Sequence, residues 1–176
     1  NRKLGYTARR TMQVAQSLYE NGHITYMRTD STNLASVAIE DARKLIVTEY
    51  GEKFLPAEPR VYKSKVKNAQ EAHEAIRPTG HPIELPEVVR AKLNADEFKL
   101  FDLIWKRTIA SQMEDARGRR IIVTIEGEGC AFQVSGKTID FPGYLRAYVE
   151  GSDDPSADLA DQERILPPVE VGQSLA

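Results

Sequence analysis

A tyrosine followed by a run of polar side chains is the part of this sequence best suited to covalent chemistry. Tyr26 lies in His23–Arg28, a stretch of β-branched and aromatic residues that predicts a short strand, and Thr29–Asn33 follow directly. Strand ends that lead into loops often present reactive groups on a rigid support. A phenol, with a pKa of about 10, is a poor nucleophile at pH 7, so the neighbouring Arg28 would help by favouring the phenolate and neutralising an attacked phosphate. The alternative is a tyrosine that packs with a satisfied hydroxyl.

A second candidate site is the segment Asn68–Thr79. Glu71, His73 and Glu74 suggest a metal site, but their spacing does not put two histidines one helical turn apart, and no third ligand is evident. We therefore do not predict zinc. A histidine and an arginine, His73 and Arg77, in a basic, proline-stiffened loop favour contact with phosphate. A surface salt-bridge network of Glu71, Glu74 and Arg77 remains open as the alternative.

The distribution of charge bears on the partner more than the net charge does. The formal net charge of −2 argues weakly against a nucleic-acid-binding domain. Cations nevertheless outnumber acids in residues 1–28 and in residues 60–81, whereas acids gather in residues 150–163. A protein that holds DNA needs such local positive fields. On charge alone, DNA-binding faces and merely solvated faces remain equally open.

Several classes of protein are disfavoured because their sequence features are missing. No run approaches the roughly 18 consecutive apolar residues of a membrane helix, and no signal peptide is recognisable. There is no G-x-x-x-x-G-K-[ST] loop for ATP and no Asp-x-Asp pair beside a strand for Mg²⁺. The single cysteine, Cys130, fits a reducing, cytoplasmic setting, and we expect it to be buried in a strand. The chain begins at Asn1 and ends at Ala176 without a feature typical of a natural terminus, so we expect a piece of a longer protein.

Helical periodicity dominates the first part of the chain. The spacing predicts helices over residues 7–21, 35–50, 87–92 and 96–113, and a proline-rich, largely irregular segment over residues 52–86. The longest helix carries an apolar stripe at three- and four-residue steps, which we expect to be core. Its members are Phe98, Phe101, Trp105, Ile109 and Met113.

The later part of the chain changes to a period of two. Ile121–Ile125 and Phe132–Val134 alternate in the manner of strands, and Val169–Leu175 could form one more. The sequence therefore predicts an α+β fold. A mainly helical, tyrosine-bearing domain would span residues 1–115, and a β-rich part would span residues 116–176.

Two motifs resemble those of type IA DNA topoisomerases. Gly22–Ser31, with the letters G-H-I-T-Y-M-R-T-D-S, resembles the active-site motif of that family, and Gln70–Thr79 contains its second signature, E-A-H-E-A-I-R-P. Met27 after the tyrosine is similar to the bacterial topoisomerase I branch, since topoisomerase III relatives usually have proline there. A topoisomerase III, a reverse gyrase, and a non-catalytic DNA-binding module in which Tyr26 merely packs are the alternatives.

The resemblance implies a reaction and a set of site residues. In that family the tyrosine cuts one DNA strand through a 5′-phosphotyrosyl link, a second strand passes, and the break is resealed, which relaxes negative supercoils without ATP. By this resemblance Tyr26 is the nucleophile and Arg28 contacts the scissile phosphate. His73 and Arg77 are implied DNA-binding residues.

The resemblance also implies partners outside this segment. The expected substrate is single-stranded or underwound DNA, and no membrane partner is expected. Family members use Mg²⁺ held by an N-terminal Toprim domain, so we expect no metal ligand in this chain and expect the isolated segment to be inactive. The β-rich part would belong to the arch of the enzyme, and the location would be the cytoplasm of a bacterium, at the nucleoid.

Overall fold

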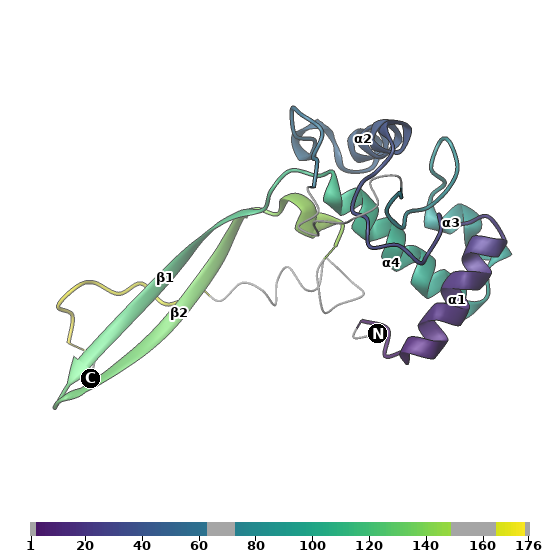
Figure 1. The fold of residues 1–176 in the computed structure, drawn as a ribbon. Coiled ribbons are helices and arrows are strands. Elements are labelled where there is room, and N and C mark those ends of the chain that lie inside the picture. The colour runs from purple at the N-terminus through teal and green to yellow at the C-terminus, as the bar shows by residue number, and fades with distance from the viewer. Residues whose placement is uncertain (1–2, 63–72, 149–164, 175–176) are drawn as a thin grey trace.

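The computed structural model describes residues 3–62, 73–148 and 165–174, with the helices gathered at one end and a two-stranded hairpin projecting from them (Figure 1). Within these ranges the helices are α1 (Ala8–Glu20), α2 (Ser36–Tyr50), α3 (Pro86–Val89) and α4 (Ala95–Ser111). The strands are β1 (Arg117–Gly127) and β2 (Cys130–Phe141), and short 3-10 turns span Glu52–Phe54, Arg90–Lys92 and Gly143–Arg146. The α+β class is confirmed, and three of the four expected helices are present with small shifts at their ends, whereas the one expected over residues 87–92 divides into α3 and the 3-10 turn Arg90–Lys92.

α4 is the central helix, because α1, α2 and α3 all pack against it. A capping box closes its N-terminus: the Asn94 side chain accepts hydrogen bonds from the backbone N–H groups of Asp96 and Glu97, and the Glu97 carboxylate accepts one from the Asn94 N–H. Most of the expected apolar stripe is buried, which confirms that it is core. The buried members are Phe101, Trp105, Ile109 and Met113.

Polar contacts attach α1 to the first turn of α4. The Tyr6 hydroxyl and the Arg10 guanidinium donate hydrogen bonds to the two oxygens of Asp96, at 2.9 and 3.0 Å. The Ser17 hydroxyl donates to Glu97 at 2.6 Å. The bonds from Arg10 and then Tyr6 lower the pKa of Asp96, and the bonds from Ser17 and then the helix-cap N–H lower the pKa of Glu97. Both carboxylates are therefore held in their ionised form.

The loop that follows α1 is hydrogen-bonded to the loop that precedes α3. The Thr25 N–H donates to the Arg77 carbonyl at 2.9 Å, and the Thr79 N–H donates to the His23 carbonyl at 3.0 Å. The Thr25 hydroxyl adds two more bonds: it donates to the Ala75 carbonyl at 2.7 Å and accepts from the Arg77 N–H at 2.9 Å. Two segments about fifty residues apart in sequence are thereby joined.

The strand expected over His23–Arg28 is wrong. Only Ile24 forms a β-bridge, to Pro78, and the chain bends at Met27. The apolar residues that suggested a strand instead anchor the loop, since Ile24 is 1% exposed and Met27 is 8% exposed. Two buried side chains in a short extended segment produce the same local composition as a strand.

The hairpin pairs β1 and β2 along their full lengths, with Val123 opposite Val134. Glu128 and Gly129 both have positive φ, at 47° and 79°, which is the backbone of a tight two-residue turn. Most of its side chains are exposed, including Phe132, because in the described part of the chain no other element forms a layer over it.

Two expectations for the β-rich part are wrong. Cys130 is exposed rather than buried, because it begins β2 beside the hairpin turn. The strand expected at Val169–Leu175 is absent from the part of it that the structure describes, residues 169–174.

The hairpin leaves and rejoins the helices at a single crossing. Gly143 has φ +49° and lies so close to the Asp115 peptide that an added Cβ would be 2.4 Å from the Asp115 carbonyl carbon. Beside it, the Glu114 N–H donates to the Phe54 carbonyl and the Glu114 carbonyl accepts from the Tyr144 N–H, both at 2.8 Å. The outgoing and returning segments are thus fixed to each other and to the helical part.

The contacts between α1 and α4 predict a loss of stability in acid. Because the folded-state pKa values of Asp96 and Glu97 are lowered, their ionised forms stabilise the fold above the unfolded-state values, and this contribution is lost as the pH falls through the folded-state values. We expect the melting temperature to fall more steeply in the wild type than in Asp96→Asn between about pH 5 and about pH 2.5. Glu128→Gln, at the hairpin turn, should follow the wild type. Parallel profiles for the wild type and Asp96→Asn would contradict this account.

The Thr25 hydroxyl predicts a difference between two conservative substitutions. Thr25→Val should lower the free energy of unfolding by about 1–3 kcal/mol, because valine leaves the Ala75 carbonyl and the Arg77 N–H without a partner. Thr25→Ser keeps the hydroxyl and should lose clearly less. Urea denaturation of the three proteins measures both effects. Equal losses in the two variants would show that removing the hydroxyl costs no more than removing the methyl group, which would contradict this account.

Candidate active site

Tyr26 lies on the loop after α1, and its side chain is 43% exposed. Its ring meets the Tyr19 ring edge-on, with centroids 5.2 Å apart and planes at 69°. The backbone on either side is fixed by the buried Ile24 and Met27. No hydrogen bond to the Tyr26 hydroxyl is found among the described residues. The loop therefore presents an accessible phenol oxygen from an anchored backbone.

Arg28, two residues further on, is exposed to solvent. Its guanidinium makes no hydrogen bond or ion pair with any residue that the structure describes. A cation in this state can bind a phosphate through charge-assisted hydrogen bonds without first breaking a contact to a carboxylate. Arg28 is thus chemically available near Tyr26.

Arg77 is placed differently, because Glu74 occupies its guanidinium. The Arg77 Nε and Nη2 donate to the two Glu74 oxygens at 2.7 and 3.2 Å, and Nη1 donates to the Pro78 carbonyl at 2.8 Å. Glu74 also accepts a hydrogen bond from the Ala35 N–H, at 2.8 Å, at the start of α2. Of the network left open as the alternative, the salt bridge between Glu74 and Arg77 is present, and it fastens this loop to α2.

His73 begins the described part of the second motif and is exposed. Two residues later, the Ala75 N–H donates to the Asn33 carbonyl at 2.7 Å, so the two motif loops also meet beyond Thr25. Glu71, the third member of the alternative salt-bridge network, lies outside the described residues. Three lysines of the basic region 60–81 also lie outside them: Lys63, Lys65 and Lys67.

The fold brings the two motif loops side by side without joining their candidate side chains. Two backbone bonds and the Thr25 hydroxyl connect residues 23–25 with residues 75–79. Within the described ranges, no hydrogen bond or ion pair links Tyr26 or Arg28 to His73 or Arg77. The adjoining loops thus carry four candidate side chains that are not bonded to one another in the described part of the chain.

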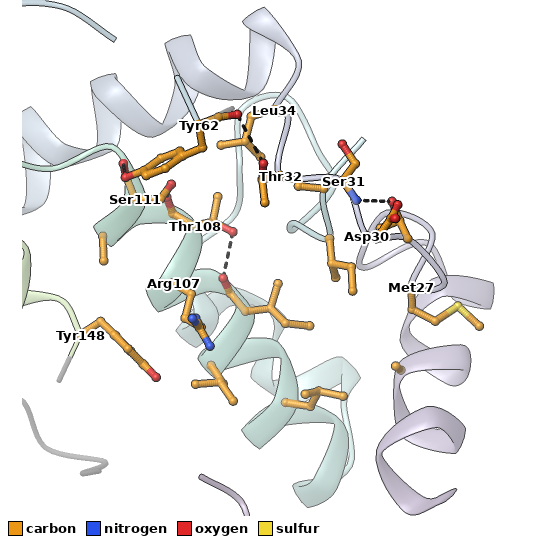
Figure 2. Close-up of a pocket in the computed structure, with 18 of the residues that line it drawn as sticks. Met27, Asp30, Ser31, Thr32, Leu34, Tyr62, Arg107, Thr108, Ser111 and Tyr148 are labelled. Atoms are coloured by element: carbon orange, nitrogen blue, oxygen red, sulfur yellow. Dashed lines mark hydrogen bonds between the residues drawn. The ribbon is translucent and has the colours of Figure 1, made fainter. Parts of the chain in front are cut away.

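A groove of about 810 Å³ lies between the tyrosine loop and α4 (Figure 2). Its walls include Met27 and Thr32 from the loop and Arg107 from the helix. The Arg107 guanidinium lies 5.4 Å from the ring centroid of Tyr148. Sequence reasoning missed this groove. The sequence feature that could have indicated it is a second stripe of side chains on α4, beside the core stripe. This second stripe consists of Leu100, Leu103, Ile104 and Arg107.

The donor groups of the described chain do not fit a metal site. No group of three or more histidine, cysteine, aspartate or glutamate side chains there is arranged to hold an ion. The described part also contains no helix that is both long enough and apolar enough to cross a membrane.

Curated relatives match nearly the whole chain. "DNA topoisomerase 1" of Streptomyces coelicolor is 56% identical over 180 residues, which cover 99% of this chain and 19% of that protein. The protein of the same name from Synechococcus elongatus is 57% identical over 98% of this chain and 19% of its own length. That of Mycobacterium tuberculosis is 50% identical over 99% of this chain and 20% of its own length. The chain thus spans about a fifth of the length of these relatives.

A solved structure and a family model agree with these relatives. Full-length topoisomerase I from Thermotoga maritima is similar with a TM-score of 0.70 and 35% identity, over 86% of this chain and 25% of that one. The family model described as DNA topoisomerase matches residues 1–176. The chain therefore belongs to the DNA topoisomerase family, in the type IA class that its two motifs resemble.

Proposed function

We propose that this chain is the strand-cutting segment of a type IA DNA topoisomerase and that Tyr26 is its nucleophile. The observation that carries the proposal is the exposed phenol of Tyr26 on a loop whose backbone is fixed by buried neighbours and by the second motif. Exposure gives a DNA strand access to the oxygen, and the fixed backbone limits where that oxygen can lie.

The proposed reaction exchanges one phosphodiester for another. The Tyr26 oxygen loses its proton and attacks the phosphorus, and a tyrosyl–phosphate bond forms as the bond to the 3′ oxygen breaks. The 3′ oxygen leaves and takes up a proton, while the 5′ phosphate stays on the protein. An aryl oxygen leaves more readily than an alkoxide, so the 3′ hydroxyl can attack in turn and reseal the strand without ATP. Passage of a second strand through the gap relaxes negative supercoils.

Arg28 has the clearest supporting role in this proposal. Its guanidinium, which no described residue pairs, would neutralise charge on the attacked phosphate, and that stabilisation grows as charge redistributes in the transition state. His73, which is exposed on the adjoining loop, would contact the DNA backbone nearby. The Arg77 guanidinium is paired with Glu74, so its first role would be to hold the loop, and only donor groups not used in that pair would bind DNA.

The remaining components are proposed to lie outside this segment. We propose that the substrate is single-stranded or underwound DNA, that a Toprim domain of the parent chain supplies Mg²⁺, and that the enzyme acts in the bacterial cytoplasm at the nucleoid. Bound Mg²⁺ would supply a positive charge for phosphoryl transfer. Since the described donors do not fit a metal site, none of the steps above is assigned to the ion. By the same division, the isolated segment should be inactive.

Tyr26→Phe tests the proposal in the intact parent enzyme. The substitution removes only the attacking oxygen, and the ring can still pack on Tyr19, so cleavage should be abolished while DNA affinity and folding stay nearly unchanged. Denaturing gels that detect the covalent protein–DNA adduct measure the effect. Tyr144→Phe, at another exposed tyrosine, is the matched control. An adduct still formed by Tyr26→Phe would leave this chain as a DNA-binding module or move the nucleophile elsewhere.

Arg28→Ala should separate rate from affinity in the same enzyme. Loss of one preorganised charge-stabilising group typically costs about 10²–10³ in kcat, and the cleavage rate at saturating DNA should fall by that order. DNA affinity should fall much less, because many other contacts hold the strand. Arg28→Lys keeps the charge and should recover part of the rate. Equal losses in rate and affinity would make Arg28 an ordinary positioning contact.

A further inference from the structure

The ring of Tyr19 is the described aromatic neighbour of Tyr26. The centroids are 5.2 Å apart and the planes meet at 69°, which is the edge-to-face arrangement that aromatic pairs prefer. Tyr19 is 42% exposed, so it is not simply a core residue. Since the Tyr26 hydroxyl has no hydrogen-bond partner among the described residues, this ring contact is what the structure offers to orient the Tyr26 side chain.

The backbone of Tyr19 is held in place by the end of α1. It lies in the last turn of α1, beside Leu18, whose side chain is fully buried. Its carbonyl accepts the Gly22 N–H at 2.9 Å, and the Leu18 carbonyl accepts the His23 N–H at 2.8 Å. These two bonds close the helix end, with Gly22 in the left-handed region at φ +74°. The chain therefore returns directly from Tyr19 to the segment that carries Tyr26.

Polar contacts attach α1 to α4 and so fix the position of the last turn of α1 relative to α4. Ser17, two residues before Tyr19, donates its hydroxyl to Glu97, and Arg10 pairs with Asp96. Both acceptors lie in the capped first turn of α4, the central helix. The backbone that carries Tyr19 is thus fixed on both sides, and this limits where its ring can lie beside Tyr26.

We propose that Tyr19 is a positioning residue that holds the Tyr26 ring in the rotamer from which its oxygen attacks. This inference rests on the proposed role of Tyr26 as nucleophile. The contact is made by the ring, so the Tyr19 hydroxyl is not required. An edge-to-face contact of this kind changes the population of one rotamer by roughly 2- to 10-fold, and the cleavage rate follows that population.

The test uses three substitutions at this position in the intact parent enzyme. Tyr19→Phe keeps the ring, Tyr19→Leu keeps bulk without an aromatic edge, and Tyr19→Ala removes both. Single-turnover cleavage of a single-stranded oligonucleotide at saturating enzyme should be slowed roughly 2- to 10-fold in the Leu and Ala variants and be unchanged in the Phe variant. The dissociation constant for the same oligonucleotide should not change. Gln13→Ala, exposed on α1, controls for general effects on the helix.

The outcomes separate this inference from the proposed function. Wild-type cleavage by Tyr19→Leu would overturn it, and so would a loss of rate matched by an equal loss of affinity, which would make Tyr19 a DNA-stacking residue. If Tyr19→Ala fails to fold, the comparison of the Leu and Phe variants still decides. If Tyr26→Phe is inactive while Tyr19→Leu is normal, only the positioning role fails. If Tyr26→Phe still forms the adduct, the proposed function fails first.

Discussion

The pairing of two loops around the Thr25 hydroxyl is the constraint on which the rest of the site depends. One hydroxyl serves a carbonyl and an N–H of the second motif, and backbone bonds lie on either side of it. Tyr26 is the next residue along the chain, so its backbone cannot move without disturbing this pairing. The second loop is held in turn by Glu74, which joins Arg77 to the start of α2. The two loops and the start of α2 therefore share one hydrogen-bonded network.

The acidic residues of the helical part explain how a chain of net charge −2 can present a usable cation. Asp96, Glu97 and Glu74 are each occupied by a structural partner. Arg28 has no such acidic partner in the described ranges, although acids and cations are nearly balanced overall. The field at a site depends on which charges are already paired nearby, and the total charge says little about it.

The sequence predicted the helices well because their signals are local. The helix caps at Thr7 and Asn94 form within three residues of sequence, and the apolar stripe of α4 follows helical spacing. Candidate residues such as Tyr26 and Arg28 were found from a motif. Sequence reasoning failed where the deciding interaction is long-range. Whether His23–Arg28 forms a strand depends on a partner fifty residues away, which offers only one bridge.

The contacts of the candidate site were less predictable than its residues. The edge-to-face contact of Tyr19 with Tyr26 depends on how the chain turns after α1, where Gly22 has a positive φ. The pairing of Arg77 with Glu74 was one of two open interpretations, since the same residues suit phosphate contact. The exposure of Cys130 depends on its place at the tip of the hairpin, over which no other described element forms a layer. Each of these depends on tertiary geometry that spacing does not encode.

The crossing at Gly143 has a mechanical consequence. β1 contains 11 residues, so the hairpin extends roughly 35 Å from that crossing at about 3.3 Å per residue. Its two strands are bonded along their whole length and fixed together at their base, so a force on the turn at Glu128–Gly129 rotates the hairpin as one lever arm instead of sliding one strand along the other. A pull at the tip therefore arrives at the helices as a torque about the Asp115–Gly143 contact. The stiffness of this crossing, including the Glu114 hydrogen bonds to Phe54 and Tyr144, sets how much of the torque the helical part receives.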